Sequence, residues 1–154
     1  MHRSGRSRRR RRSLSLSGVL LDTHVLIWSL FDQPQMTPSA RSWIDPSEPI
    51  YVSVVSIFEI DNKRRRGGSR ATDALLHRMP RNMPAALPQL GFTLLAIDPD
   101  VAWRAANLPI DARDPWDRIL VAQALALDVP LISADGPLRA STQRHPQTSG
   151  VIVF

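Results

Sequence analysis

The chain has 154 residues, a formal net charge of +6 and no cysteine. Its length fits one domain with a core large enough to fold without cross-links. The lack of cysteine excludes a disulfide framework and a thiolate zinc site, and the four histidines show no ligand spacing, so any bound metal would be a hard cation on oxygen ligands, such as Mg²⁺ or Mn²⁺.

Residues 1–18 carry the positive charge. They contain seven Arg and no acid, whereas residues 19–154 contain 13 basic and 14 acidic side chains. A like-charged segment with so few apolar residues predicts a disordered Arg-rich extension. A nucleic-acid-attracting arm is a second interpretation, and a secretion signal is a third. Asp22 and His24 interrupt the apolar stretch that a signal needs, and no apolar run is long enough to cross a bilayer, so we expect a cytoplasmic protein without membrane contact.

The first half of the chain alternates apolar runs with helical patterns. Residues 19–21 predict a strand, and apolar residues at helical spacing follow it over 26–30. A Thr-Pro start predicts a short helix over 36–45. Residues 50–54 (IYVSV) predict a second strand, and a Ser cap and a Gly-Gly end predict a helix over 54–66.

The second half continues the alternation. Residues 69–90 predict two weaker helical stretches broken by prolines, and 92–97 predict a third strand. Two Asp-Pro pairs predict helices that start at 98 and 114. The last strands are predicted at 129–133 and 151–154, with a turn at 135–137. Continuously apolar strands between helices are typical of a parallel sheet covered on both faces, so we predict an α/β fold, a three-layer α/β/α sandwich around a five-stranded parallel sheet.

Acidic residues follow or flank the carboxyl ends of several predicted strands, where open parallel sheets bind ligands. The set consists of Asp22, Glu59, Asp114, Asp117 and Asp135. Each has an ordinary alternative role: the aspartates can cap or start helices or make turns, and Glu59 can pair with Lys63 one turn further on. The set is harder to explain in this way, because converging carboxylates repel one another unless a cation neutralises them. The sequence therefore favours a Mg²⁺ or Mn²⁺ site, and with no nucleotide-binding loop or nucleophile motif, phosphodiester hydrolysis is the chemistry that remains.

Four segments that contain these acids resemble a PIN-domain ribonuclease, specifically the VapC toxin of VapBC toxin–antitoxin pairs. They are LLDTHVLIW at 20–28, VSVVSIFEI at 52–60, ARDPWDRILVAQALA at 112–126 and LISAD at 131–135. They occur in family order, and the resemblance covers residues 19–154, which we take as the PIN nuclease domain. It implies a five-stranded parallel sheet and a metal site that cleaves RNA.

The resemblance also assigns roles to individual residues. It implies Asp22, Glu59, Asp117 and Asp135 as catalytic metal ligands, with Asp114 and Ser133 in support. Two aromatic positions depart from the family pattern: Phe58 stands where Trp is usual, and Trp116 where Phe is usual. Asp61-Asn62 replaces a usual Ala-Ile pair, which bears on how that helix packs and meets a partner.

The function that follows is a Mg²⁺-dependent endoribonuclease toxin that cleaves RNA by metal-activated water and inhibits translation. The resemblance implies a VapB-like antitoxin as partner and a homodimer. A catalytically inert PIN module that only binds RNA or protein is the alternative, and a phosphoryl-acceptor domain is a third possibility. Four arginines after Glu59 are RNA-binding candidates, although an ordinary solvated helix end explains them equally well: Arg64, Arg65, Arg66 and Arg70.

Overall fold

Five short parallel strands form one sheet in the computed structural model of the chain, which describes residues 17–67 and 71–154. They are β1 (Val19–Leu21), β2 (Ile50–Ser53), β3 (Phe92–Leu95), β4 (Leu131–Ile132) and β5 (Ile152–Val153), in the order β3-β2-β1-β4-β5. Every predicted strand is present, and each one predicted to exceed three residues is shorter than predicted. The predicted extension over residues 1–18 lies almost wholly outside the described residues, as does Arg70.

Along the chain, the described helices lie between the strands. They are α1 (Thr23–Leu30), α2 (Pro38–Ser42), α3 (Val54–Arg66), α4 (Ala71–Leu76), α5 (Met83–Gln89), α6 (Pro99–Asn107), α7 (Pro115–Leu127) and α8 (Gly136–Gln143). The prediction of α3 is confirmed at both ends, with Ser53 as its N-cap and Gly67 after its last residue. The predicted helix over 36–45 is present but shorter, as α2. The sequence does not predict α8, which begins within the predicted turn at 135–137.

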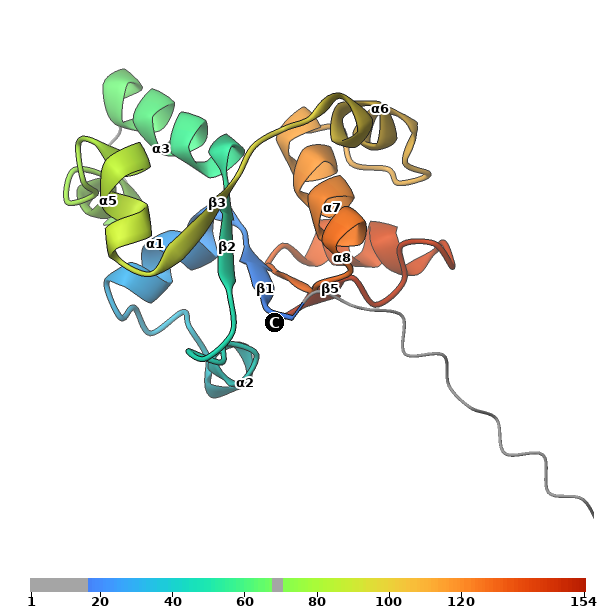
Figure 1. Cartoon of the computed structure of the whole chain (residues 1–154), viewed down its shortest axis with the longest axis horizontal. Helices are drawn as coiled ribbons and strands as arrows, with labels where there is room; N and C mark the ends of the chain where they lie inside the picture. Colours follow the sequence, from blue (N-terminus) through green and yellow to red (C-terminus); the bar gives the residue numbers. More distant parts are fainter. Residues whose placement is uncertain (1–16, 68–70) are drawn as a thin grey trace, which may run out of the picture.

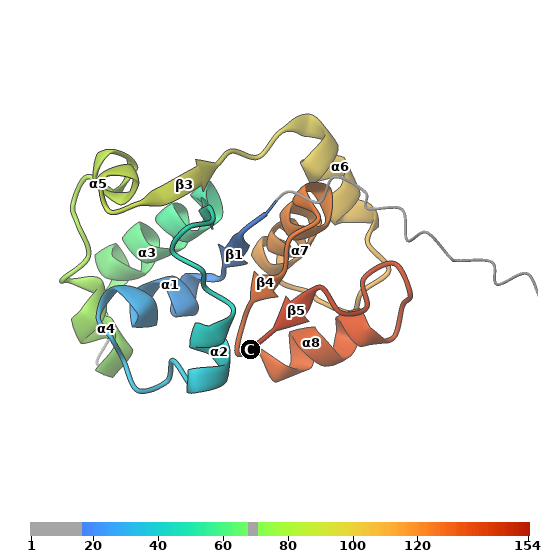
Figure 2. The ribbon, with the colours of Figure 1, turned by 60° about the horizontal axis from the view of Figure 1, so that its bottom comes forward.

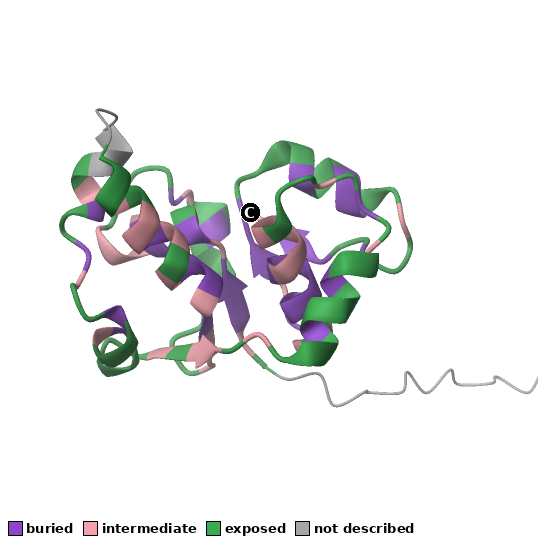
Figure 3. Cartoon of the chain, turned by 90° about the horizontal axis from the view of Figure 1, so that it is seen from above, coloured by how far each residue is buried: buried purple, intermediate pink, exposed green. Residues whose placement is uncertain are grey.

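The sheet separates two hydrophobic cores. Val19 and Leu21 point into one, with buried residues of α1, α2, α4 and α5, while Leu20 points into the other, with residues of α7 and α8. Figures 1 and 2 show the same division, with α1, α3 and α5 on one side of the strands and α6, α7 and α8 on the other. Figure 3 shows buried residues gathered at the strands and on inward helix faces. The predicted three-layer α/β/α sandwich is confirmed.

Tight packing fixes the start of β1, which carries the first candidate acid at its end. Gly18 has φ of +111°, and a Cβ added to it would overlap the carbonyl oxygen of Pro49. Only glycine avoids this overlap and adopts this backbone conformation without strain. Within the described part of the chain, no helix is long and apolar enough to cross a membrane.

Candidate active site

Three of the predicted acids stand where the chain turns from an irregular segment or strand into a helix. Asp22 follows β1 directly, Asp114 precedes α7, and Asp135 precedes α8. Each caps its helix, because its Oδ1 accepts a backbone N–H: from Val25 at 2.8 Å, from Trp116 at 2.9 Å and from Leu138 at 2.8 Å, respectively. The capping interpretation of these residues is therefore correct, and it leaves the second oxygen of each carboxylate for another role.

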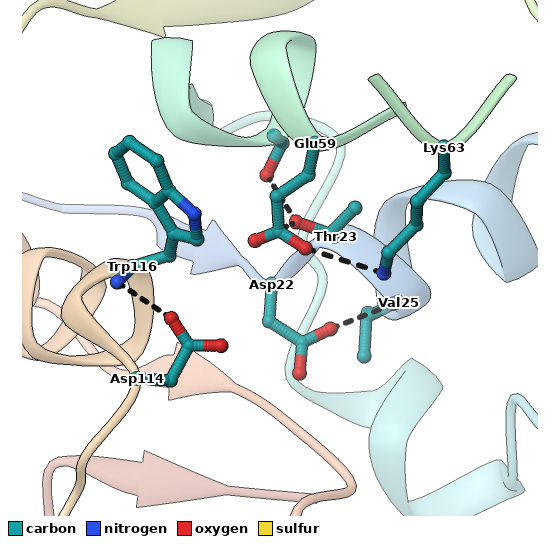
Figure 4. A network of polar contacts seen from close by, with 8 residues as sticks. Asp22, Thr23, Val25, Glu59, Lys63, Asp114 and Trp116 are labelled. Carbon is teal, nitrogen blue, oxygen red and sulfur yellow. Dashed lines mark hydrogen bonds and ion pairs between the residues drawn. The ribbon is translucent and has the colours of Figure 1, made fainter. Parts of the chain in front are cut away.

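A cleft of about 440 Å³ brings all five predicted acids together beyond the ends of β1 and β4. Its lining consists of Asp22, Thr23, His24, Trp28, Glu59, Lys63, Asp114, Asp117, Leu120, Ala134 and Asp135. In Figure 4 the carboxylates of Asp22, Glu59 and Asp114 face the same space, although they come from three different parts of the chain. The cleft thus combines acids from the start of α1, the middle of α3 and the starts of α7 and α8.

Glu59 is held by a network of polar side chains (Figure 4). Thr23 donates its hydroxyl to Oε1 of Glu59 at 3.3 Å and shares a hydrogen bond of 3.0 Å with Ser56, which is fully buried. Lys63 donates from Nζ to Oε2 at 3.3 Å. Both oxygens of the carboxylate therefore have a partner, and these contacts fix the direction in which Glu59 enters the cleft.

Crowding of carboxylates changes their proton affinity. The pKa of Asp117 is raised to about 7, first by burial and then by the nearby negative charges of Asp114, Asp135, Glu59 and Asp22. Burial also raises the pKa of Asp22, whereas a hydrogen bond from the Ser133 hydroxyl acts in the opposite direction. The cleft is thus a site of concentrated negative charge that a cation would relieve.

The donor set suits a hard divalent cation, since carboxylate and hydroxyl oxygens line the cleft. Within residues 17–67 and 71–154, however, no three carboxylate or imidazole groups form a ready-made ligand cage. Mg²⁺ does not require one, because it keeps several waters and is commonly held by one or two carboxylates. The residues therefore fit a partly hydrated Mg²⁺ better than a fully protein-coordinated ion.

Comparison with known proteins places this arrangement in a family. Residues 19–140 match the PIN domain. The chain belongs to the PIN-domain family. It is also similar to Ribonuclease VapC22 of Mycobacterium tuberculosis strain H37Rv, with 29% identity over 137 residues, which cover 86% of this chain and 96% of that protein.

Solved structures share the PIN fold of this chain at low sequence identity. A toxin–antitoxin complex from Klebsiella pneumoniae has a TM-score of 0.56 at 18% identity and covers 88% of this chain and 96% of its own. VapBC2 from Rickettsia felis, bound to a DNA fragment from its promoter, has a TM-score of 0.57 at 10% identity, with coverage of 89% and 98%. FitAcB from Neisseria gonorrhoeae has a TM-score of 0.54 at 19% identity, with coverage of 78% and 89%.

Three of the predicted RNA-binding arginines lie within the described residues, Arg64, Arg65 and Arg66, and none of these three lines the cleft of this PIN domain. Arg64 and Arg65 both bind Asp61, at 2.6 Å each, and Arg64 also donates to the carbonyl oxygen of Met79. These bonds lower the pKa of Asp61, through Arg64 first and then Arg65. Arg66 is exposed at the end of α3. Of the cationic groups on α3, Lys63 is the one that lines the cleft.

Two polar neighbours of the acids add contacts that the sequence does not fully indicate. Thr23 is not among the predicted residues, although a polar residue directly after the first acid of an apolar segment is a usable signal. Ser133 was predicted to support an acid, and its buried hydroxyl also accepts the backbone N–H of Asp135 at 3.2 Å. Ser133 thereby joins the ends of β1 and β4, and so couples the positions of Asp22 and Asp135.

The raised pKa of Asp117 predicts how pH affects stability without metal. In EDTA the folded protein binds the proton of Asp117 more tightly than the unfolded chain, whose carboxyl has the ordinary pKa of 3.8, so stability should fall as pH rises from about 4 to about 7. Asp117→Asn should remove this loss. Allowing for solvent screening, we expect the free energy of unfolding of the variant to exceed that of the wild type by about 2 kcal/mol at pH 8. At pH 5 the difference should be less than half as large. Urea unfolding at both pH values measures this, and an equal difference at the two would contradict it.

Proposed function

We propose that this PIN domain is a Mg²⁺-dependent endoribonuclease, with Mn²⁺ as a possible substitute, and that it acts as the toxin of a toxin–antitoxin pair and inhibits translation. The observation that carries the proposal is the convergence of five carboxylates on one cleft, where burial and mutual repulsion raise the pKa of Asp117 to about 7. The similarity to a ribonuclease of the VapC type supports RNA as the substrate class.

In this proposal Asp22, Glu59, Asp117 and Asp135 surround the metal and hold it directly or through its waters, and Asp114 and Ser133 support them. The helix caps engage Oδ1 of Asp22, Asp114 and Asp135, which leaves Oδ2 of each without a helix N–H. When bound, Mg²⁺ would lower the pKa of a coordinated water and neutralise charge on the phosphoryl group.

The protein groups around the acids have separate tasks. Lys63 and Thr23 fix the carboxylate of Glu59, so that little ordering is left to be done when the substrate arrives. The ammonium of Lys63 also gives the cleft a positive group that can approach a phosphate oxygen. Ser133 binds both Asp22 and Asp135 and so fixes their relative positions at the ends of β1 and β4.

Purified full-length protein tests the proposal directly. We expect it to cleave single-stranded RNA in Mg²⁺, to lose this activity in EDTA and to recover it when Mg²⁺ or Mn²⁺ is restored. Mapping the 5′ ends of cellular RNA after brief induction would then identify the target. Metal-dependent RNA binding without any cleavage, by protein that is folded and free of antitoxin, would replace the proposal with an inert binding module.

The partner that we propose is an antitoxin with an Arg that enters the acidic cleft. The structural relatives include toxin–antitoxin complexes, and a guanidinium can form charge-assisted hydrogen bonds with clustered carboxylates. Co-expression with the neighbouring gene, followed by co-purification, tests the partnership. Substitution of the antitoxin's cleft-facing Arg by Ala should restore some cleavage while the complex persists. A homodimer stays a prediction that size-exclusion chromatography with light scattering can check.

A further inference from the structure

A second hollow continues the acidic cleft on its α8 side. Its volume is about 380 Å³, and it shares two lining residues with the first cleft, Asp117 and Asp135. Its other walls come from the segment between α6 and α7 and from one side of α8. The two hollows therefore adjoin each other, and a path along both passes two of the proposed metal ligands.

The far part of this path carries positive charge, in contrast to the acidic cleft. Arg113 and Arg144 both line it and are both exposed. Arg144 binds Asp111 at 2.6 Å, and the side chains of this pair are 64% and 72% exposed, so solvent screening weakens the bond and a competing anion can displace it. No ion pair joins Arg113 to another described residue.

The walls of the second hollow are fixed to each other. The backbone N–H of Asp111 donates to the hydroxyl of Ser141 on α8 at 2.6 Å, and Ser141 is buried. This bond ties the segment that carries Arg113 to the helix whose end carries Arg144, although the two lie about 30 residues apart in sequence. The two guanidinium groups are thus brought to one hollow by the fold.

We propose that the RNA strand runs from the acidic cleft over Asp117 and Asp135 into the second hollow, where Arg113 and Arg144 bind a backbone phosphate next to the scissile one. This inference rests on the proposed function and deepens it. Carboxylates alone repel a phosphate, whereas a guanidinium offers it paired, charge-assisted hydrogen bonds. The phosphate takes the place of Asp111 as the partner of Arg144. Arg64 and Arg65 do not serve here, because neither of them lines the acidic cleft or the second hollow.

Steady-state cleavage of a labelled single-stranded RNA that spans a mapped site tests this path. We expect Arg113→Ala and Arg144→Ala each to raise KM about fivefold with kcat nearly unchanged, since the lost contact binds substrate and transition state alike. Asp111→Asn should lower KM about twofold, because it removes a negative charge and releases Arg144. Arg139→Ala is the matched control: it removes an exposed Arg from the same helix without altering the hollow, and its KM should match the wild type.

A modified substrate distinguishes a direct arginine–phosphate contact from long-range electrostatic attraction between the protein and RNA. Replacing the phosphate next to the scissile one with a neutral methylphosphonate should raise KM for the wild type but add nothing in Arg113→Ala and Arg144→Ala, because coupled contacts are not additive. If the effects of the methylphosphonate and of the substitutions on KM are fully additive, the proposed RNA path is wrong. It is also wrong if Arg139→Ala raises KM as much as Arg113→Ala and Arg144→Ala do. The path is likewise wrong if Arg113→Ala and Arg144→Ala lose affinity for a protein partner but keep the wild-type KM for RNA.

A different result would show that the proposed nuclease function, and not the RNA path, is wrong. If the wild type cleaves no RNA in Mg²⁺, the nuclease proposal fails, and binding of the same oligonucleotide to the full chain, measured by fluorescence anisotropy, then decides the path. Weaker binding by Arg113→Ala and Arg144→Ala, with a salt slope shallower by about 0.7 for each lost contact, supports it. Unchanged binding by both variants rejects it.

Discussion

Asp22→Asn should reduce metal-dependent RNA cleavage by at least about 100-fold, because a metal site contributes several kcal/mol to such a reaction and each 1.36 kcal/mol changes the rate tenfold. The shape of the site should survive the change. Asn keeps the oxygen that accepts the N–H of Val25, and Asn caps helices as well as Asp does. Burial and Glu59 raise the pKa of the Asp22 carboxyl, so the neutral amide should leave the metal-free protein equally stable or more stable.

The measurements are single-turnover cleavage in Mg²⁺ and thermal unfolding with and without the metal. The wild type should gain melting temperature when Mg²⁺ is added, because a ligand that binds only the folded state stabilises it, and Asp22→Asn should gain much less. Asp98→Asn provides a matched control. Asp98 caps α6 with the same geometry, a 2.8 Å bond from the N–H of Val101, but it does not line the cleft. Wild-type cleavage by Asp22→Asn would show that the site is assigned wrongly.

The acidic cleft was predictable because its position follows from local rules. An Asp that ends an apolar run, or that precedes Pro, caps a helix, and parallel strands present their carboxyl ends at one edge of the sheet. The strand rule places Asp22 and Asp135 at one edge of the sheet, and the Asp-Pro rule places Asp114 at the start of a helix. Glu59 was predictable for another reason, since one of only two glutamates in the chain stands among large apolar residues of α3.

The structure also explains departures that looked unrelated in the sequence. Phe58 and Trp116 each differ from the family pattern, and their rings pack together with centroids 5.1 Å apart (an exposed Phe from α3 against a partly buried Trp from α7). An aromatic contact therefore joins α3 and α7 beside the cleft. Asp61, the other departure, binds Arg64 and Arg65, and neither arginine lines the cleft, so their RNA-binding role stays a prediction.

The features that sequence reasoning missed depend on tertiary contacts. The segment of α8 has Leu138 as its single large buried residue, so no apolar periodicity marks it as a helix. Pairs such as Asp111 with Arg144 join residues 33 positions apart, and composition gives no sign of them. The second hollow depends on the packing of α8 beside the segment between α6 and α7, and no local sequence pattern indicates that packing.

The guanidinium of Arg118 organises that segment. It donates to five backbone carbonyl oxygens, those of Ala105, Ala106, Leu108, Ile110 and Ala112, at distances from 2.7 to 3.2 Å. An arginine side chain has five N–H donors, so each donor is matched by a carbonyl. The first two carbonyls lie in the last turn of α6, where backbone acceptors commonly lack helical partners, although that of Ala105 also accepts the N–H of Leu108 at 3.5 Å. Arg118 thus holds the end of α6 and the path toward Asp114 in place.

Arg118→Ala should therefore destabilise the protein by about 3 kcal/mol, because it removes charge-assisted hydrogen bonds and leaves several partly buried carbonyl groups without a partner. Arg118→Lys should recover only part of the loss, since an ammonium has three donors and lacks the planar shape that reaches both sides of the segment. Arg104→Ala, which removes an exposed Arg of α6, should change stability by less than about 0.5 kcal/mol. Urea unfolding gives these differences from the shift in midpoint at constant slope. If Arg118→Lys is as stable as the wild type, a single positive charge is sufficient at this position and the five-carbonyl explanation is wrong.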